Sequence, residues 1–266
     1  MRVRPPRSLV LRRGSVLDTY PGLGLGNYLF FALRAHIERQ QGFRTWVLDS
    51  GLNPRWGEAL PLLVPLLTGP RSAAFRRLRH IPQYFHQGYG SDFTRAQLEQ
   101  FISEVILSAR PPQALTPDLV INVRRGDYYV DPGLRKIYAF DVPRYIRQAI
   151  PNATNGAPTG WLSVVSDDVA WCRRKLSWLA DHAEIVTFGA QTPGPVGDFW
   201  EVATARTLVL GNSTFSYWAG YVSQVLHGSA HLGVWAPAFH QRNIDDGTPW
   251  QHDPRWHAVP VCLGPE

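Results

Sequence analysis

The stretch VINVRRGDYY, residues 120–129, carries an apolar strand straight into two positive charges and a glycine. Arg124 and Arg125 stand where the strand ends, and Gly126 and Asp127 follow them. Two adjacent guanidinium groups are costly at such a place unless an anion balances them. Because strand side chains alternate between faces, one arginine can bind an anionic ligand while the other pairs with a carboxylate such as Asp127. Gly126 allows a tight turn, and a salt-bridged turn without a ligand is the structural alternative.

The sequence on both sides of this stretch predicts an α/β fold. Between residues 118 and 235, apolar runs of strand length alternate with runs of helical periodicity. Such alternation is typical of a parallel sheet with helices on both faces, and ligands then bind beyond the carboxyl ends of the strands. The predicted strands are 119–123, 161–165, 184–188, 207–210 and 230–235, and the predicted helices are 141–150, 168–179, 196–205 and 214–226.

A second α/β unit comes earlier in the chain. It contains a short strand, the glycine-rich loop GLGLGN at 22–27, a helix that ends at Gly42, a second strand at 43–48 and a later helix that Thr94 opens. Residues 51–93 are only patchily periodic, and the proline-rich residues 110–117 predict a linker. The predicted organisation is a basic tail at 1–14, an N-terminal α/β domain at 15–112 and a C-terminal α/β domain at 118–266.

A cluster of carboxylates follows the predicted strand at 161–165. Ser166, Asp167 and Asp168 can present a carboxylate to the hydrogen-bond donors of a purine edge such as guanine, or can cap the next helix. A metal site is the third interpretation. Two adjacent carboxylates without another nearby ligand suit magnesium poorly, so this interpretation is disfavoured.

A cluster of small polar residues precedes the last predicted helix. Gly211, Asn212, Ser213 and Thr214 lie between strand and helix, and Ser216 lies in the first helical turn. Backbone amides, hydroxyls and the helix dipole make such a place a ready phosphate site, and a well-capped helix is the structural alternative. Taken together, the three clusters predict that a nucleoside diphosphate binds at the strand ends without a metal ion.

The charge of the chain leaves a non-enzymatic alternative open. The 266 residues carry a formal net charge of +6, and every basic residue except Lys136 and Lys175 is an arginine, histidines aside. A module that binds nucleic acid or anionic lipid would spread its arginines along one face and bind with a steep salt dependence. The arginines of interest stand instead at a predicted strand end. The glycines at 22–27 also allow a nicotinamide-dependent enzyme, although they lack the full G-x-G-x-x-G spacing.

The sequence predicts a cytoplasmic protein. No run of residues has the length and apolar character of a signal peptide or a membrane span, and Cys172 and Cys262 make no disulfide framework. The basic tail is compatible with peripheral contact with an anionic membrane surface, and a solvated tail is the alternative. Its arginines are Arg2, Arg4, Arg7, Arg12 and Arg13.

Four motifs in order resemble the bacterial alpha-1,2-fucosyltransferases, glycosyltransferase family eleven. They are GLGNYLF at 24–30, NVRRGDY at 122–128, VVSDD at 164–168 and NSTFSYWAGY at 212–221, and they span nearly the whole chain. The resemblance implies a GT-B-like fold, in which two Rossmann-like domains with parallel sheets face a cleft. It also implies GDP-beta-L-fucose as the donor substrate and inversion at the anomeric carbon of fucose, with no metal ion and no other cofactor.

The resemblance further implies roles for individual residues. Arg124 would bind the beta-phosphate of the donor and offset the charge of the departing GDP, and Asp167 or Asp168 would bind the guanine edge. The residues at the start of the last predicted helix would hold phosphate oxygens, and the glycine loop would face fucose and acceptor. The implied donor-binding residues are Gly24, Gly26, Asn27, Asn122, Arg124, Arg125, Asp167, Asp168, Asn212, Ser213, Thr214 and Ser216.

Two positions depart from the family pattern. Asn122 stands where the family usually has histidine, and an asparagine cannot take up a proton; Tyr28 stands where glutamine is usual. Asp127 is the nearest candidate for a catalytic base that would deprotonate the acceptor hydroxyl. Since an ion pair with an arginine weakens a carboxylate as a base, the phosphate of GDP, or no dedicated base, stays open.

The predicted function is transfer of L-fucose from GDP-beta-L-fucose to a hydroxyl, namely O2 of a galactose, in a glycan acceptor. The predicted partners are this donor and a galactose-containing glycan, without nucleic acid. Removing a fixed donor such as Arg124 from a transition state of this kind costs about 3 kcal/mol. A transferase of the same fold with another nucleotide sugar is the first alternative, and the anion-binding module is the second.

Overall fold

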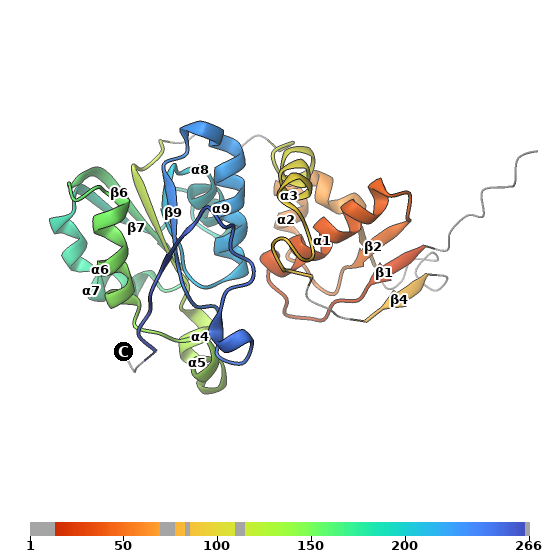
Figure 1. The fold of residues 1–266 in the computed structure, drawn as a ribbon, viewed down its shortest axis with the longest axis horizontal. Coiled ribbons are helices and arrows are strands. Elements are labelled where there is room, and N and C mark those ends of the chain that lie inside the picture. The colour runs from red at the N-terminus through yellow and green to blue at the C-terminus, as the bar shows by residue number, and fades with distance from the viewer. Residues whose placement is uncertain (1–13, 70–77, 83–85, 110–114, 264–266) are drawn as a thin grey trace, which may run out of the picture.

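The computed structural model describes residues 14–69, 78–82, 86–109 and 115–263. Residues 1–13 of the predicted tail and residues 110–114 of the predicted linker lie outside these ranges. The described strands form a four-stranded sheet in the order β3-β2-β1-β4 and a six-stranded sheet in the order β10-β9-β8-β5-β6-β7. All their pairings are parallel. The predicted α/β fold with two Rossmann-like units is thereby confirmed (Figure 1).

The strands follow the predicted positions with three additions. In the first sheet they are β1 Ser15–Leu17, β2 Thr45–Leu48, β3 Leu67–Thr68 and β4 Arg79–Ile81. In the second sheet they are β5 Leu119–Val123, β6 Thr159–Ser166, β7 Ala183–Phe188, β8 Thr207–Val209, β9 Gly233–Pro237 and β10 His257–Val259. The patchily periodic region holds β3 and β4. The prediction that β9 is the last strand is wrong, because β10 pairs with it in parallel at the sheet edge.

The helices of the four-stranded unit follow local sequence signals such as capping residues and glycines. They are α1 Leu25–Gln40, α2 Arg55–Ala59, the 3-10 helix η1 Pro61–Leu66, α3 Arg95–Phe101 and the π-helix η3 Ile102–Ile106. As predicted, Thr94 caps α3, and it forms a reciprocal capping box with Gln97. Gly42, which follows α1, has a φ of +83°, a conformation that favours glycine.

The helices of the six-stranded unit include two short ones that the periodicity did not predict. They are α4 Gly126–Val130, α5 Pro132–Tyr138, α6 Val142–Ala153, α7 Val169–Lys175, η4 Ser177–Asp181, α8 Pro195–Thr204, α9 Thr214–His227, η5 Gly228–Ala230 and η6 Asp245–Gly247. α4 and α5 follow the double arginine directly, in the segment between β5 and α6. At five and seven residues, they are too short for an apolar repeat to reveal.

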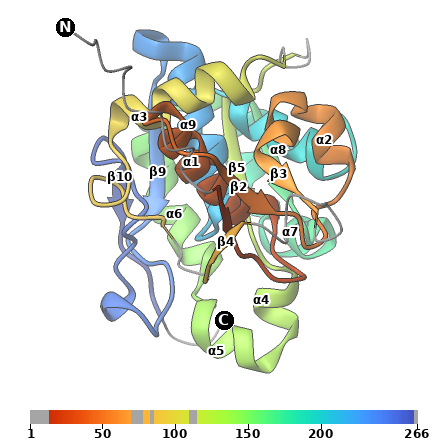
Figure 2. The same ribbon diagram turned by 90° about the vertical axis from the view of Figure 1, so that its right-hand side faces the viewer.

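A continuous apolar core joins the two units. Helices α8 and α9 cover one face of the six-stranded sheet, and α1 and α3 of the other unit pack against α9 (Figures 1 and 2). The ring of Trp218 in α9 lies edge-on to Phe30 in α1 and Phe101 in α3, at centroid distances of 5.0 and 5.6 Å. Aromatic contacts of this kind fix how the two units face each other across the cleft between them.

Of the helices that the structure describes, none combines the length and apolar character that crossing a membrane requires.

Candidate functional site

The cleft between the two units lies at the carboxyl ends of β5, β6 and β8. β5 and β8 are neighbours in the sheet although two strands separate them in sequence, so the strand order reverses between them. A parallel sheet opens a ligand-binding crevice at such a reversal. The glycine loop at 22–27 closes the cleft from the other unit, and the cavity has a volume of about 480 Å³.

The cleft collects most of the predicted site residues. Those that line it are Gly24, Gly26, Asn27, Asn122, Arg124, Asp127, Asp167, Ser213 and Thr214. The other four predicted residues, Arg125, Asp168, Asn212 and Ser216, are not among its lining residues.

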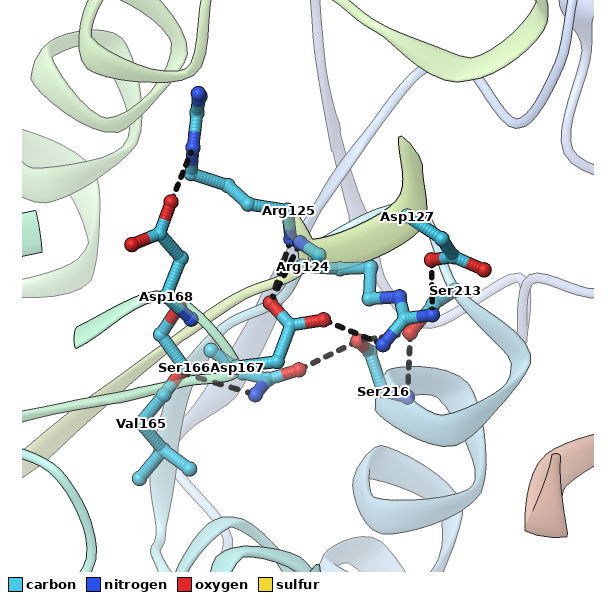
Figure 3. Close-up of polar contacts among 11 residues, drawn as sticks. Arg124, Arg125, Asp127, Val165, Ser166, Asp167, Asp168, Ser213 and Ser216 are labelled. Carbon is cyan, nitrogen blue, oxygen red and sulfur yellow. Dashed lines mark hydrogen bonds and ion pairs between the residues drawn. The ribbon is translucent and has the colours of Figure 1, made fainter. Parts of the chain in front are cut away.

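Arg124 projects into the cleft between two carboxylates. Its guanidinium donates to Asp167 from one terminal nitrogen and to Asp127 from the other, and it lies 5.0 Å from the ring centroid of Tyr128 (Figure 3). The side chain of Asp127 is 54% exposed, whereas that of Asp167 is 29% exposed. The chain therefore balances the charge of Arg124 with its own carboxylates, as in the salt-bridged turn that the sequence left open as the structural alternative.

Asp167 holds the turn that follows β5. One of its carboxylate oxygens accepts hydrogen bonds from the backbone amides of Arg125 and Gly126, at 2.8 and 3.1 Å, and the other accepts from Arg124 (Figure 3). Gly126 has a φ of +23°, and a Cβ there would lie 2.5 Å from the same carboxylate. Glycine is therefore required at this turn, and both oxygens of Asp167 are already engaged.

Arg125 turns away from the cleft, as the alternation of strand side chains predicts. Its guanidinium is sandwiched between the rings of Trp171 and Tyr129, 3.7 and 4.0 Å from their centroids. Its Nε lies 3.4 Å from Oδ2 of Asp168 in an ion pair (Figure 3). Oδ1 of Asp168 accepts a hydrogen bond from the backbone amide of Trp171 and so caps α7. These contacts give both side chains a structural role outside the cleft.

A buried chain of hydrogen bonds organises the start of α9. The Ser216 amide donates to the Ser213 hydroxyl at 3.2 Å, the Ser216 hydroxyl donates to Asn122, and the Asn122 amide donates to the Val165 carbonyl at 3.2 Å (Figure 3). Ser216 is fully buried. Asn212 is also buried, and its amide donates to two backbone carbonyls at 2.9 Å. At this helix start Ser213, Thr214 and Phe215 line the cleft, whereas Asn212 and Ser216 do not.

The start of α1 meets the start of α9 inside the cleft. Gly24 is the N-cap residue of α1 and has no side chain. No N-cap side chain therefore accepts a hydrogen bond from the first backbone amides of this helix. A Cβ on Gly26 would lie 2.4 Å from the backbone of Thr214, so only glycine allows this approach. Two helix N-termini, each with a partial positive charge, therefore point into one space.

Asp198 is a site residue that the sequence analysis missed. It lies in the first turn of α8 and lines the cleft. Burial, with Glu201 and Asp167 nearby, raises the pKa of its carboxyl to about 6. No described residue donates a hydrogen bond to it. The sequence signal that could have identified Asp198 was a carboxylate in the first turn of a helix that follows a strand. Such carboxylates are common because they interact favourably with the helix dipole, so the signal is not specific for a binding site.

The aromatic side of the cleft was not predicted either. Tyr128 in α4 and Tyr138 in α5 stack face to face, with centroids 4.1 Å apart and planes 11° apart, and both line the cleft. Burial raises the pKa of both hydroxyls, so they stay neutral and can donate hydrogen bonds. Within the described ranges, no three His, Cys, Asp or Glu side chains come together in a metal-binding group.

Comparisons with known proteins agree with the motifs. A family model described as "Glycosyl transferase family 11" matches residues 71–229, which include Arg124, Asp167, Asp198 and Ser213. An alpha-1,2-colitosyltransferase of Escherichia coli is 26% identical over 107 residues, which are 40% of this chain and 37% of that protein. The galactoside 2-alpha-L-fucosyltransferase SEC1 of Bos taurus is 34% identical over 107 residues, 39% of this chain and 28% of that protein. The similar segment thus spans about a third of these relatives.

Proposed function

The chain belongs to glycosyl transferase family 11, and on that basis we propose that it transfers L-fucose from GDP-beta-L-fucose to O2 of a galactose in a glycan acceptor. The family supports a glycosyltransferase, and similarity to a galactoside 2-alpha-L-fucosyltransferase supports fucose and galactose as the sugars. The observation that carries the proposal is the meeting of Arg124 with the starts of α1 and α9 in one cleft.

The diphosphate of the donor would bind where these positive groups meet. A guanidinium has five N–H groups, and Asp127 and Asp167 engage two of its nitrogens, so further N–H groups of Arg124 can donate to phosphate oxygens. The exposed Asp127 can also leave Arg124 at little cost, because exposed ion pairs contribute only about 0–1 kcal/mol. Asp167 would stay, since it also holds the turn at Gly126.

The geometry suits a reaction that builds charge on a leaving diphosphate. Fucosyl transfer passes through an oxocarbenium-like state while negative charge grows on GDP, and a fixed cation stabilises that state more than the ground state. Arg124 is fixed by Asp167, so little reorganisation is needed at the moment of reaction. We propose that Arg124 and the two helix N-termini supply this charge without a divalent ion, and that the acceptor attacks from the opposite face with inversion.

Asp198 is the better candidate to bind guanine. The N1–H and N2–H groups of guanine are two parallel donors that match one carboxylate. Asp167 already accepts three hydrogen bonds, and Asp168 lies outside the cleft. Asp198 lines the same cleft with no described donor to its carboxylate. We therefore propose that the guanine-binding role moves from Asp167 or Asp168 to Asp198.

Product analysis tests the proposal. The chain is incubated with GDP-fucose and a panel of beta-galactosides in the presence of EDTA, and the products are identified by mass spectrometry and by the linkage of the new sugar. We expect an alpha-1,2-fucosylated galactoside and an undiminished rate in EDTA. Transfer from a UDP-sugar in preference to GDP-fucose would refute the guanine assignment, and loss of all transfer in EDTA would refute the metal-independent mechanism.

A colitosyl donor is the second candidate, because a relative in Escherichia coli is an alpha-1,2-colitosyltransferase. The same panel, run with nucleotide-activated colitose, compares the two sugars directly. A higher kcat/KM with colitose than with fucose would assign the chain to colitosyl transfer while leaving the phosphate site unchanged.

A further inference from the structure

A row of three amide side chains leads from the C-terminal segment to the cleft. Gln251 Nε2 donates to Gln87 Oε1 at 3.0 Å, and Gln87 Nε2 donates to Asn27 Oδ1 at 2.8 Å. Gln251 is fully buried and Gln87 is 3% exposed, whereas Asn27, in the first turn of α1, lines the cleft. The row thus connects two residues that do not line the cleft to one that does.

The backbone around Gln87 is anchored. The Tyr89 amide donates to the Trp250 carbonyl at 2.9 Å, and the Tyr89 hydroxyl donates to Asp253 at 3.0 Å. The Gly88 amide, next to Gln87, donates to Asp92 at 2.8 Å. Gln87 therefore cannot move far without breaking the contacts of the two residues that follow it.

The direction of the row decides which half of the Asn27 amide faces the cleft. With its Oδ1 occupied by Gln87, Asn27 has its NH2 group left, and no described residue accepts a hydrogen bond from it. Reversing every amide would keep both hydrogen bonds but would bury the NH2 group of Gln251 without an acceptor. The observed direction leaves the Gln251 carbonyl oxygen unpartnered but keeps its NH2 group hydrogen-bonded through one N–H, and because buried unpaired donors are rarer than unpaired acceptors, it is the favourable direction.

We propose that Gln87 is a positioning residue: it holds the Asn27 amide so that the NH2 group donates into the cleft, to an oxygen of the nucleotide diphosphate. The inference rests on the proposed function, which places a diphosphate there. A phosphate oxygen only accepts hydrogen bonds, so a position that can only donate matches it. Asn27 also stands in the first turn of α1, beside Gly26 and the start of α9, where the helix dipoles favour an anion.

A double-mutant cycle on GDP affinity, measured by titration calorimetry, tests the inference. We expect Asn27→Ala to weaken GDP binding about tenfold and Gln87→Met, of similar volume, about fivefold. Because Gln87 acts through Asn27, the double variant should lose about tenfold and not about fiftyfold. A merely structural role for Gln87 would give independent, multiplying losses.

Two further variants complete the experiment. Gln87→Glu keeps the size and the acceptor for Gln251 but cannot donate when ionised, so Asn27 should turn its oxygen to the cleft and lose at least as much affinity as in Gln87→Met. Gln224→Met is the matched control, because Gln224 accepts from Trp256 at 2.8 Å away from the cleft, and it should bind GDP like the unaltered chain.

The outcomes distinguish the role of Gln87 from the existence of the nucleotide site. Unchanged GDP affinity in both Gln87 variants, or multiplying losses in the double variant, would overturn the role of Gln87 while GDP binding by the unaltered chain upholds the nucleotide site. Failure of the unaltered chain to bind GDP would overturn the proposed function, and the positioning role with it. If Gln87→Met does not fold, the GDP affinity of Gln87→Glu, alone and combined with Asn27→Ala, gives the same test.

Discussion

The two walls of the cleft differ in kind. The wall from the six-stranded unit carries the charges, namely Arg124, Asp127, Asp167 and Asp198, together with hydroxyls at the start of α9. The wall from the four-stranded unit presents glycine backbone, the amide of Asn27 and apolar or aromatic groups, and no described lining residue on it is charged. One wall can therefore bind a charged ligand through charged side chains, whereas the other offers only the partial positive charge at the start of α1, hydrogen bonds and shape.

The difference suggests how a sugar nucleotide would divide between the walls. The charged wall suits guanine and most of the contacts to the diphosphate, which have strong electrostatic and hydrogen-bonding features. The wall without charged side chains suits the sugars, which are neutral and are recognised by aromatic faces and by single hydrogen bonds, and it contributes Asn27 and the start of α1 to the diphosphate. Variants on each wall should therefore fail in different ways.

Removing the cation of the charged wall should have the largest effect. We expect Arg124→Ala to lower kcat/KM about 100-fold, or about 3 kcal/mol, because it removes the fixed charge opposite the leaving diphosphate. Arg124→Lys should recover only part of this loss, since a lysine cannot donate to Asp127, Asp167 and a phosphate in one plane. Steady-state kinetics with GDP-fucose measures both. Unchanged GDP affinity and turnover in Arg124→Ala would show that the diphosphate does not bind at Arg124.

Forcing the walls apart should come next. In Gly26→Ala the new Cβ would lie 2.4 Å from the backbone of Thr214, and such overpacking costs about 1–3 kcal/mol. We expect a lower melting temperature and a further loss of transfer, because the starts of α1 and α9 separate. Gly24→Ala is the control for stability, since nothing lies within 4 Å of a Cβ there. Equal melting temperatures for the two variants would contradict the close approach.

Neutralising Asp198 should change specificity more than turnover. In Asp198→Asn we expect roughly tenfold weaker GDP binding and a smaller preference for GDP over other nucleoside diphosphates, because an amide cannot accept from both guanine donors. Competition binding with GDP, ADP and UDP measures this preference. An unchanged preference for GDP in the variant would show that a residue other than Asp198 binds guanine.

The pH dependence of GDP binding gives a separate test of Asp198. Since its pKa is about 6, the carboxylate is ionised above that pH and protonates as the pH falls through it. A protonated carboxyl cannot accept both guanine hydrogens, so GDP affinity should fall between about pH 7 and pH 5. In Asp198→Asn this fall should disappear. A fall that persists in the variant would assign the titration to another group.

Freeing Arg124 from Asp127 should have the smallest effect on binding. We expect Asp127→Asn to raise GDP affinity about two- to threefold, because the phosphate no longer competes with an exposed carboxylate. Turnover in the same variant tests the other predicted role of Asp127. A loss of 100-fold or more with GDP binding intact would identify Asp127 as the catalytic base, whereas a smaller loss would favour proton transfer to GDP or to solvent.

The strand-end motifs were predictable because they depend on neighbours in sequence. The apolar runs predicted the strands that precede Arg124 and Ser213, and the caps predicted where α3 and α9 begin. The opposite directions of Arg124 and Arg125 follow from strand alternation alone, and the structure confirms them. The short helices α4 and α5 were missed because neither is long enough to show a period.

The sequence by itself determined the α/β class, the parallel sheets and the strand ends at which polar clusters gather, because periodicity and capping are local properties. Only the tertiary structure decided which of those polar groups remain available to a ligand. Asp167 reaches the turn after β5 because β6 is the neighbouring strand, Asp198 enters the cleft because α8 packs on the same sheet, and Gln87 meets Asn27 through the folding of distant segments. Which side chains form hydrogen bonds and ion pairs with one another depends on contacts between residues far apart in sequence, and no local sequence pattern predicts those contacts.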